Sequence, residues 1–261
     1  MIPARVTFLG TGTSHGVPMI GCDCATCRST DPRDSRTRPS IYLDVPGRAR
    51  ILVDTSTDLR QQALARGITR VDAVIYTHAH ADHVLGLDEL RRFNVIQGGS
   101  IPCYADARTW ESLARQFFYV FDGVERGGGG VPRLERFDID GPFAIAGVRV
   151  APVPLLHGRT PILGFRFGSF AYLTDCSAIP DESCALVAGV ETLVIDALRH
   201  KPHPTHFTVA EALVAVERVA PRRAFFTHMA HDLPHAETCA RLPRGVELAY
   251  DGLVLDVDVD G

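Results

Sequence analysis

The stretch that decides the fold runs from residue 71 to residue 83 and reads VDAVIYTHAHADH. It begins as a mostly apolar run typical of a buried strand and then places histidines and an aspartate at close spacing. His78 and His80, two residues apart at the end of this strand, can point the same way and share one metal ion. Asp82 and His83 come next, at the start of a predicted helix, and can hold a second metal ion beside the first. Because imidazole nitrogen and carboxylate oxygen suit zinc, manganese or iron, the stretch predicts a metal site.

Further candidate ligands close later apolar runs of the chain. His157, Asp175 and His228 each stand where such a run ends and a loop begins, which is where sheet proteins place many of their functional groups. Taken singly, Asp175 or His157 would more often be an ordinary polar loop residue than a ligand. As a set, they complete the ligands that two neighbouring metal ions need.

Together these residues resemble the metal signature of the metallo-β-lactamase superfamily. The resemblance implies an α/β fold of the αββα sandwich type, in which two mixed β-sheets are flanked by helices and the metals lie at one edge. It also implies how the two metals are held: His78, His80 and His157 for one, Asp82, His83 and His228 for the other, and Asp175 between them. Asp54, after the apolar run 51–53, resembles an early aspartate of the same family that orients a ligand. A turn-forming aspartate at a strand end is the alternative for this residue.

The cysteines predict a separate metal site. Three of the seven in the chain, Cys22, Cys24 and Cys27, stand in one short loop at residues 21–28. Structural zinc takes four ligands in a tetrahedron, so one is missing from this loop, and His231, three residues after His228, is the best candidate. Reduced surface thiols are the alternative. The other cysteines have no comparable spacing and are expected to be small buried residues: Cys103, Cys176, Cys184 and Cys239.

Three motifs narrow the resemblance to one family. LGTGTS at residues 9–14, the Cys-x-Cys-x-x-Cys loop and THMAHD at residues 227–232 together resemble the PhnP-type phosphodiesterases. These proteins are similar to ribonuclease Z but carry a structural zinc on three cysteines and a histidine. The resemblance implies that His228 serves the metal pair while His231 completes the structural zinc. One turn of the chain would then join both sites.

One further histidine is expected to take part in the reaction. His206 lies in PTHFT, residues 204–208, just before a helix whose start is marked by a predicted capping box from Thr208 to Glu211. The segment resembles the one that carries an active-site histidine outside the metal ligands in PhnP-type proteins. A histidine there could protonate a leaving oxygen, and a solvated loop histidine is the alternative. The remaining histidines are interpreted as ordinary ones without a functional role: His15, His200, His203 and His235.

The predicted activity is that of a phosphoric diester hydrolase. The resemblance implies a small cyclic phosphodiester as substrate, of the phosphoribosyl 1,2-cyclic phosphate kind, cleaved by a hydroxide that two divalent metals, zinc or manganese, generate from water. His206, Asp82 and Asp54 are the expected catalytic residues, and a further zinc ion is expected in the cysteine loop. Members of the family often form dimers, so the resemblance implies that this protein forms a homodimer.

Three other functions share parts of this signature. A nuclease similar to tRNase Z would have the same metal core, but it should carry a long basic arm for tRNA, and no insertion rich in lysine and arginine is present. A lactonase or thioesterase of the superfamily is a second alternative, because the metals alone do not choose phosphorus over a carbonyl carbon. A zinc protein without enzymatic activity, similar to PqqB, is the third, and it predicts lost ligands.

Composition and charge limit the remaining choices. The chain has 261 residues, with 46% hydrophobic and 22% charged residues, which excludes a disordered or collagen-like protein. Its formal net charge of −4 provides no basic field for nucleic acid. No signal peptide is visible and no stretch is long and apolar enough for a bilayer, so we expect a cytoplasmic protein without a membrane partner. Residues 1–261 are predicted to form one domain, with a flap or a plain loop at 117–133 around consecutive glycines.

Apolar periodicity predicts strands alternating with helices along the whole chain. The predicted strands are residues 6–9, 41–45, 51–53, 71–76, 143–153, 164–167, 171–174, 192–195, 223–226 and 253–257. The predicted helices are residues 57–66, 84–95, 107–118, 178–188, 209–220 and 234–241.

Overall fold

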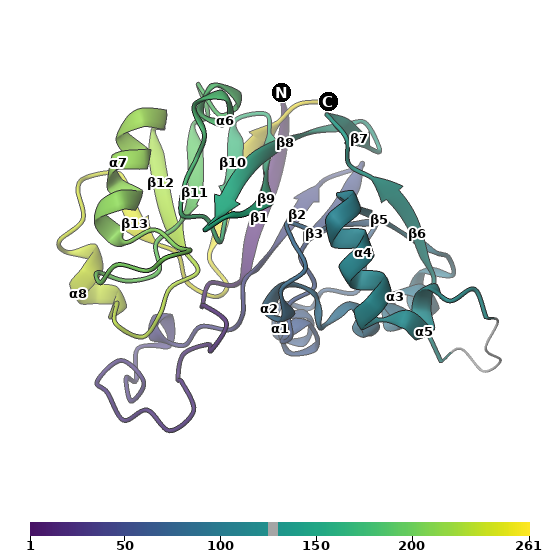
Figure 1. Ribbon diagram of the computed structural model, residues 1–261, viewed down its shortest axis with the longest axis horizontal. Coiled ribbons are helices and arrows are strands. Elements are labelled where there is room, and N and C mark those ends of the chain that lie inside the picture. The colour runs from purple at the N-terminus through teal and green to yellow at the C-terminus, as the bar shows by residue number, and fades with distance from the viewer. Residues whose placement is uncertain (125–129) are drawn as a thin grey trace.

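The first layer of the protein is a seven-stranded mixed β-sheet. The computed structural model describes residues 1–124 and 130–261 of the chain (Figure 1). The sheet is built, in spatial order, from β14 (Val254–Val259), β1 (Ile2–Gly10), β2 (Ser40–Val45), β3 (Ala49–Val53), β4 (Ala73–Ile75), β5 (Ile101–Ala105) and β6 (Leu134–Asp138). Strands β3 to β6 run parallel to one another, so their carboxyl ends share one edge of the sheet.

A second seven-stranded mixed sheet packs against the first. Its spatial order is β13 (Val246–Leu248), β12 (Arg223–Thr227), β11 (Thr192–Asp196), β10 (Phe170–Leu173), β9 (Thr160–Phe167), β8 (Val148–His157) and β7 (Phe143–Ile145). Strands β10 to β13 are parallel, so this sheet too gathers several carboxyl ends at one edge. In Figure 1 the two termini lie side by side, at the end of the sheets away from these carboxyl ends.

Helices cover the outer face of each sheet. Beside the first sheet lie α1 (Leu59–Arg66), α2 (Ala81–Val84), a 3-10 turn (Leu87–Glu89), α3 (Leu90–Gln97), α4 (Ala107–Gln116) and α5 (Phe118–Phe121) (Figure 1). Beside the second lie α6 (Asp181–Leu186), α7 (Val209–Val219) and α8 (His235–Cys239), and a short 3-10 turn (Pro32–Asp34) follows the cysteine loop.

The hydrophobic core has three parts, and they confirm the predicted αββα sandwich. A central cluster fills the space between the sheets, with Phe8 and Leu43 from the first sheet and Phe165 and Tyr172 from the second. A second cluster joins the first sheet to α1, α3 and α4, and a third joins the second sheet to α7. Both sheets therefore bury their inner faces against each other, helices cover much of their outer faces, and the outward side chains of the edge strands β14 and β6 stay exposed.

The sequence missed three strands and merged two others. β5, β6 and β13 were not predicted, and the predicted strand 143–153 is instead β7 and β8, which pair antiparallel across a turn at Ala146 and Gly147. Within the proposed flap at 117–133, residues 125–129 lie outside the described part. Phe117 at its start is 5% exposed and packs in the core, so that end of the segment is part of the fold.

The predicted helix 84–95 is broken, and the break supports the site. It divides into α2, a 3-10 turn and α3 because the N–H of Gly86 donates to the carbonyl oxygen of Thr55 at 2.9 Å. A Cβ at Gly86 would overlap the carbonyl oxygen of Ser56, so only glycine allows this approach. The contact fixes α2, which carries Asp82 and His83, against the loop that follows β3.

Within the described ranges, no helix combines the length and the apolar character that crossing a bilayer requires.

Candidate metal centres and active site

The predicted ligands meet at the strand ends where the two sheets share an edge. Asp54 directly follows β3, His157 is the last residue of β8, and His228 directly follows β12. Asp54, Asp175 and His228 all have positive backbone φ angles, of 64°, 57° and 58°. Such left-handed conformations are uncommon outside glycine, and they turn the chain sharply at the end of a strand. Their concentration at one edge indicates a functional site.

Two groups of four potential metal ligands occupy this edge, and a smaller group of Asp196, His206 and His228 adjoins them. His78, His80, His157 and Asp175 form one group, and Asp82, His83, Asp175 and His228 form the other. Within each group the ligand atoms lie within 4.8 Å of one another, and Asp175 belongs to both. All of these residues are buried except His80. The structure therefore brings together every residue that the sequence proposed for the metal pair.

Three histidines of these groups are oriented by hydrogen bonds at Nδ1, so that Nε2 is left for a ligand bond. Nδ1 of His78 donates to Oγ1 of Thr77 (3.0 Å), whose own hydroxyl donates to Asp54 (2.8 Å). Nδ1 of His83 donates to Asp54 (2.7 Å), and Nδ1 of His157 donates to the carbonyl oxygen of Thr205 (2.8 Å). The Nε2 atoms of His78 and His83 are buried 3.8 and 3.1 Å from the Asp175 carboxylate, and within the described residues neither makes a hydrogen bond. Because buried polar atoms are almost always paired, these orphaned nitrogens fit metal ligands.

Asp54 lies below this cluster and orients part of it. Its carboxylate accepts the N–H and the hydroxyl of Thr77, both at 2.8 Å, as well as Nδ1 of His83. Burial raises the pKa of Asp54, while the charge of His83 acts in the opposite direction. The residue is fully buried and also makes the left-handed turn after β3. Both functions considered for Asp54, turn former and partner of a ligand, thus coexist.

The acidic ligands carry their negative charge despite burial. Burial by itself raises the pKa of Asp175, but the charges of His228 and His83 outweigh it and lower the pKa well below its usual range. The pKa of Asp82 is lowered in the same way by His83 and His228. Nε2 of His228 lies 3.2 Å from Asp175 and 3.4 Å from Asp82. The site thus presents ionised carboxylates close to histidine nitrogens, a donor set that suits zinc or manganese.

His206 stands beside these groups and has a partner that the sequence reasoning missed. Its Nδ1 lies 2.7 Å from the carboxylate of Asp196, a fully buried residue at the end of β11. The ring of His206 stacks on that of His228 at 4.7 Å and packs edge-on against His157 at 4.6 Å. Burial raises the pKa of Asp196 well above its usual range and lowers that of His206 to about 4. Asp196 ends a predicted apolar strand just as other site residues do, and that signal could have found it.

The capping box predicted before α7 is present. Oγ1 of Thr208 accepts the N–H of Glu211 at 3.2 Å, and the Glu211 carboxylate accepts the N–H of Thr208 at 2.8 Å. The box anchors the helix start directly after His206. Since these N–H groups are already bonded, they are not free to bind a substrate phosphate.

The cysteine loop and His231 form a third group of four potential ligands. The Sγ atoms of Cys22, Cys24 and Cys27 lie 3.1, 3.3 and 3.5 Å from Nδ1 of His231. The N–H of Cys27 donates to Sγ of Cys24 and lowers the pKa of that thiol to about 7, whereas burial raises the pKa of Cys27 to about 11. Three sulfurs and one imidazole nitrogen in contact are the donor set of a structural zinc site.

A short turn connects this group to the buried clusters. His228 and His231 belong to the same loop after β12. Arg36, whose side chain is fully buried, donates to the carbonyl oxygens of Ala230 and Leu233 and so holds the far part of this loop. Displacement of His231 is therefore expected to disturb His228.

Comparisons with known proteins place these residues in context. A family model described as a beta-lactamase superfamily domain matches residues 49–229. A solved structure described as a new diphosphatase from the PhnP family is 45% identical, and the match covers 98% of this chain and 99% of that chain with a TM-score of 0.92. The Zn²⁺-bound PqqB from Methylobacterium extorquens is 21% identical, covers 97% of this chain and 100% of that chain with a TM-score of 0.76, and shares the fold.

One curated relative is about twice as long as the part that this chain matches. An octanoyltransferase of Porphyromonas gingivalis is 38% identical over 259 residues, which is 98% of this chain but 52% of that protein. The chain spans about half the length of the first curated relatives that it matches. Octanoyl transfer is therefore the named activity of a longer protein.

Proposed function

The chain belongs to the PhnP family of the β-lactamase superfamily of hydrolases, and on that premise we propose that it cleaves a small cyclic phosphodiester, such as phosphoribosyl 1,2-cyclic phosphate. One observation carries this proposal: two groups of potential metal ligands share Asp175 and lie beside the Asp196–His206 pair. Within these groups, buried histidine nitrogens make no hydrogen bond and are available to a metal ion. The 45% identity to a PhnP-family diphosphatase favours phosphorus over a carbonyl carbon as the centre of attack.

Two divalent metals, zinc or manganese, fit the donor set at this edge. His78, His80 and His157 would hold one ion, and Asp82, His83 and His228 the other, with Asp175 between them. Such a pair binds phosphate oxygens and makes water nucleophilic at neutral pH. Its charges would also make the site locally positive, although the whole chain carries a formal charge of −4. An anionic substrate is therefore compatible with this net charge.

The residues of the chain supply orientation and a proton. Asp54 and Thr205 fix the rings of His83 and His157 through Nδ1, so that Nε2 faces the ligand positions. Asp196 likewise fixes His206, which leaves Nε2 of His206 to face the substrate. As the water oxygen bonds to phosphorus and the phosphorus–oxygen bond to the sugar breaks, the neutral ring of His206 gives the proton on Nε2 to the departing oxygen and takes one on Nδ1 from Asp196, whose pKa burial raises. The proton that the attacking water loses then restores Asp196.

A third cation, held apart from the reaction, completes the proposal. Cys22, Cys24, Cys27 and His231 provide the three sulfurs and one nitrogen that a structural zinc requires. The half-buried cysteines are free thiols rather than disulfides, which agrees with a reducing compartment such as the cytoplasm.

Diphosphate hydrolysis is the second candidate, because a 45% identical protein is described as a diphosphatase. It would use the same ligands and the same His206, with a phosphate in place of a sugar as the leaving group. The two candidate functions differ in substrate but would use the same metal ligands and the same proton donor.

A substrate screen tests both candidates directly. The metal-loaded protein should be assayed with ribose 1,2-cyclic phosphate, 2′,3′-cyclic nucleotides, bis-p-nitrophenyl phosphate and a nucleoside diphosphate. Turnover of cyclic diesters above that of the diphosphate supports the first candidate, and the reverse order supports the second. A preference for long RNA, or hydrolysis of lactones and thioesters alone, would contradict both.

A further inference from the structure

The fully buried side chain of Arg36 is a cation that the proposed reaction does not use. The carboxylate of Asp34, itself largely buried, lies 3.5 Å from one Nη atom of this guanidinium. Nε of Arg36 makes no hydrogen bond within the described residues, so its polar contacts are those of the two Nη atoms. Burying such a pair costs free energy that well-packed apolar side chains would avoid. The hydrogen bonds of Arg36 therefore indicate what the residue contributes.

The side chain of Arg36 holds the segment that carries His231. One Nη atom donates to the carbonyl oxygen of Ala230 at 2.8 Å, and the other donates to the carbonyl oxygen of Leu233. Ala230 directly precedes His231 and Leu233 follows it by two residues, so the guanidinium fixes the backbone on both sides of this candidate ligand. A planar guanidinium presents its N–H donors in a fixed fork, which a single ammonium group does not.

The backbone of Arg36 closes the cysteine loop. Its N–H donates to the carbonyl oxygen of Val17 at 2.7 Å, and its carbonyl oxygen accepts the N–H of Val17 at 2.8 Å. Residues 18–35 lie between these two partners and include all three cysteines of the loop. One residue therefore holds the base of the cysteine loop with its backbone and the segment around His231 with its side chain.

The turn between His228 and His231 is also bonded on the side of the first sheet. The N–H of Met229 donates to the carbonyl oxygen of Thr11 at 2.9 Å, and the carbonyl oxygen of Met229 accepts the N–H of Thr13 at 3.1 Å. Each of these bonds joins two protein groups, so none of them depends on a metal ion. The turn is thus held between the end of β1 on one side and Arg36 on the other.

We propose that Arg36 is a positioning residue that arranges the three cysteines and His231 for zinc before the ion binds. The inference rests on the structural zinc of the proposed function and specifies what holds its ligands. Ligands that are already in place lose less conformational freedom when they bind, so the metal affinity of this group depends on Arg36. Because His228 lies in the same turn, Arg36 also steadies one ligand of the metal pair without contacting it.

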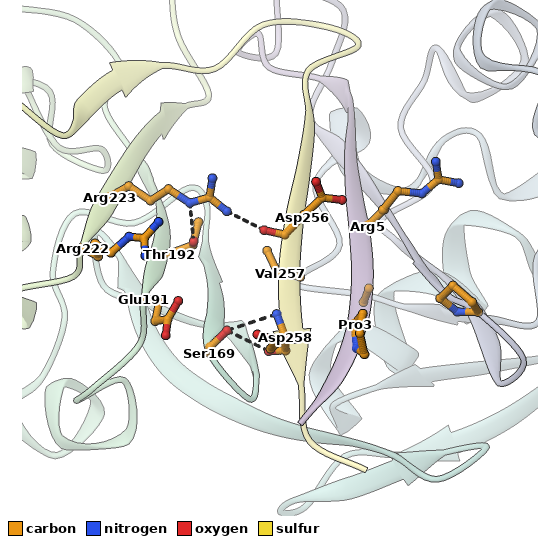
Figure 2. A pocket seen from close by; sticks show the side chains of 12 residues that line it. Pro3, Arg5, Ser169, Glu191, Thr192, Arg222, Arg223, Asp256, Val257 and Asp258 are labelled. Carbon is orange, nitrogen blue, oxygen red and sulfur yellow. Dashed lines mark hydrogen bonds between the residues drawn. The ribbon is translucent and has the colours of Figure 1, made fainter.

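Arg223 provides a matched control. Figure 2 shows this residue at a pocket of about 560 Å³, where its guanidinium donates to Oγ1 of Thr192 at 2.8 Å and to the backbone carbonyl oxygen of Asp256 at 2.6 Å. Like Arg36, it joins distant segments of the chain through a carbonyl oxygen. It stands at the start of β12, whereas His228 follows the end of that strand. Loss of Arg223 should therefore weaken the fold without moving a metal ligand.

Cobalt binding tests the inference, because Co²⁺ bound to thiolates gives a charge-transfer absorption that the histidine and carboxylate groups cannot produce. Titration of the metal-free protein with Co²⁺ therefore reports on the cysteine loop alone. Arg36→Lys keeps the charge but not the fork, so we expect the cobalt dissociation constant to rise by about 10–100-fold, the usual loss when a group that orients a ligand is removed. Arg223→Met should keep the affinity of the unaltered protein and should lower the unfolding midpoints of the metal-free and metal-loaded forms equally.

Two results of this titration would overturn the inference. One is an affinity of Arg36→Lys equal to that of the unaltered protein, and the other is an equal loss of affinity in Arg223→Met. Absence of the thiolate absorption in the unaltered protein would overturn it as well. Failure of the metal-loaded, unaltered protein to hydrolyse any phosphodiester or diphosphate would instead overturn the proposed activity, and it would leave the cobalt result unaffected.

Hydrogen exchange tests the same claim without a variant. After metal removal from the unaltered protein, the amides of Val17, Arg36 and Met229 should still exchange roughly tenfold or more slowly than the amide of Ile20, an exposed residue of the same loop. Exchange of all four amides at the same rate would show that the metal ion, rather than Arg36, holds these segments, and would overturn the inference.

Discussion

The buried clusters around Asp175 and the cysteine loop around His231 lie on either side of one turn, yet they are assembled differently. The buried clusters gather residues from strand ends that are far apart in the sequence, and hydrogen bonds at Nδ1 orient His78, His83 and His157. The cysteine loop takes three ligands from six consecutive residues and only one from elsewhere, and its cysteines are half-buried. The clusters contain buried polar atoms that make no hydrogen bond, and they lie beside a pocket lined by His206. This arrangement is typical of a catalytic site. The loop ties two segments of chain together, which suits stability.

The largest expected effect lies in the buried clusters. Asp82→Ala removes a ligand from one metal position, so kcat for bis-p-nitrophenyl phosphate should fall by about a thousandfold or more at saturating metal. Stopped assays at rising metal concentration measure this loss. Asp140→Ala, at an exposed site, serves as control and should retain full activity. Full turnover of the Asp82 variant would remove this residue from the site.

A smaller loss is expected when the ligands remain but the acid is gone. His206→Ala should lower kcat by about 10²–10⁴-fold, the usual contribution of general acid–base catalysis, while the metal content stays the same. His200→Ala provides the matched control. If kcat of the His206 variant equals that of the control, the proton comes from another group.

The cysteine loop should respond in stability before activity. Cys24→Ser removes one zinc ligand, so the melting temperature should fall and one metal equivalent should be lost. Because the turn from His228 to His231 is shared, turnover should also decrease, but by less than in the Asp82 and His206 variants. Calorimetry and metal analysis measure these changes, and Cys184→Ser is the control outside the loop. Unchanged stability would contradict a structural zinc.

The smallest effect concerns a carboxylate that lies outside both centres. Asp251 accepts the N–H and hydroxyl groups of Thr11 and Thr37, and burial raises its pKa to about 6, in contrast to the lowered pKa of Asp175. Since the folded protein holds this proton more tightly, the associated stability is full below pH 4 and lost as the pH rises through 6, by up to about 3 kcal/mol. Asp251→Asn should remove this part of the pH dependence in denaturant unfolding. A pH dependence identical to that of the exposed control Asp256→Asn would be at odds with this.

The sequence identified most of the site because its strongest signals are local. The motif at residues 71–83 places several ligands behind one strand, and the cysteine loop places three more within six residues. Asp196 was missed although it ends a predicted strand, because its role depends on contact with His206, which only the fold brings about. The carbonyl oxygen of Thr205 that orients His157 carries no side-chain signal at all.

The sequence predicted the αββα fold class correctly, but it did not predict every strand and helix. The missed elements have physical explanations. β5 contains a proline and β13 has only three residues, so neither shows the periodicity of a longer strand. The break of the predicted helix 84–95 depends on the carbonyl oxygen of Thr55, which is distant in sequence from Gly86. Sheet pairing and close backbone approach are properties of the assembled protein rather than of a short segment.

Metal content measured together with turnover tests the central claim most directly. The purified, metal-saturated protein, analysed by plasma mass spectrometry and assayed with bis-p-nitrophenyl phosphate, should contain three metal ions per chain, one of them zinc that resists mild chelation, and should turn the substrate over. One tightly bound zinc without turnover would contradict the account. That result would instead indicate a zinc-binding protein that uses the same fold without catalysis.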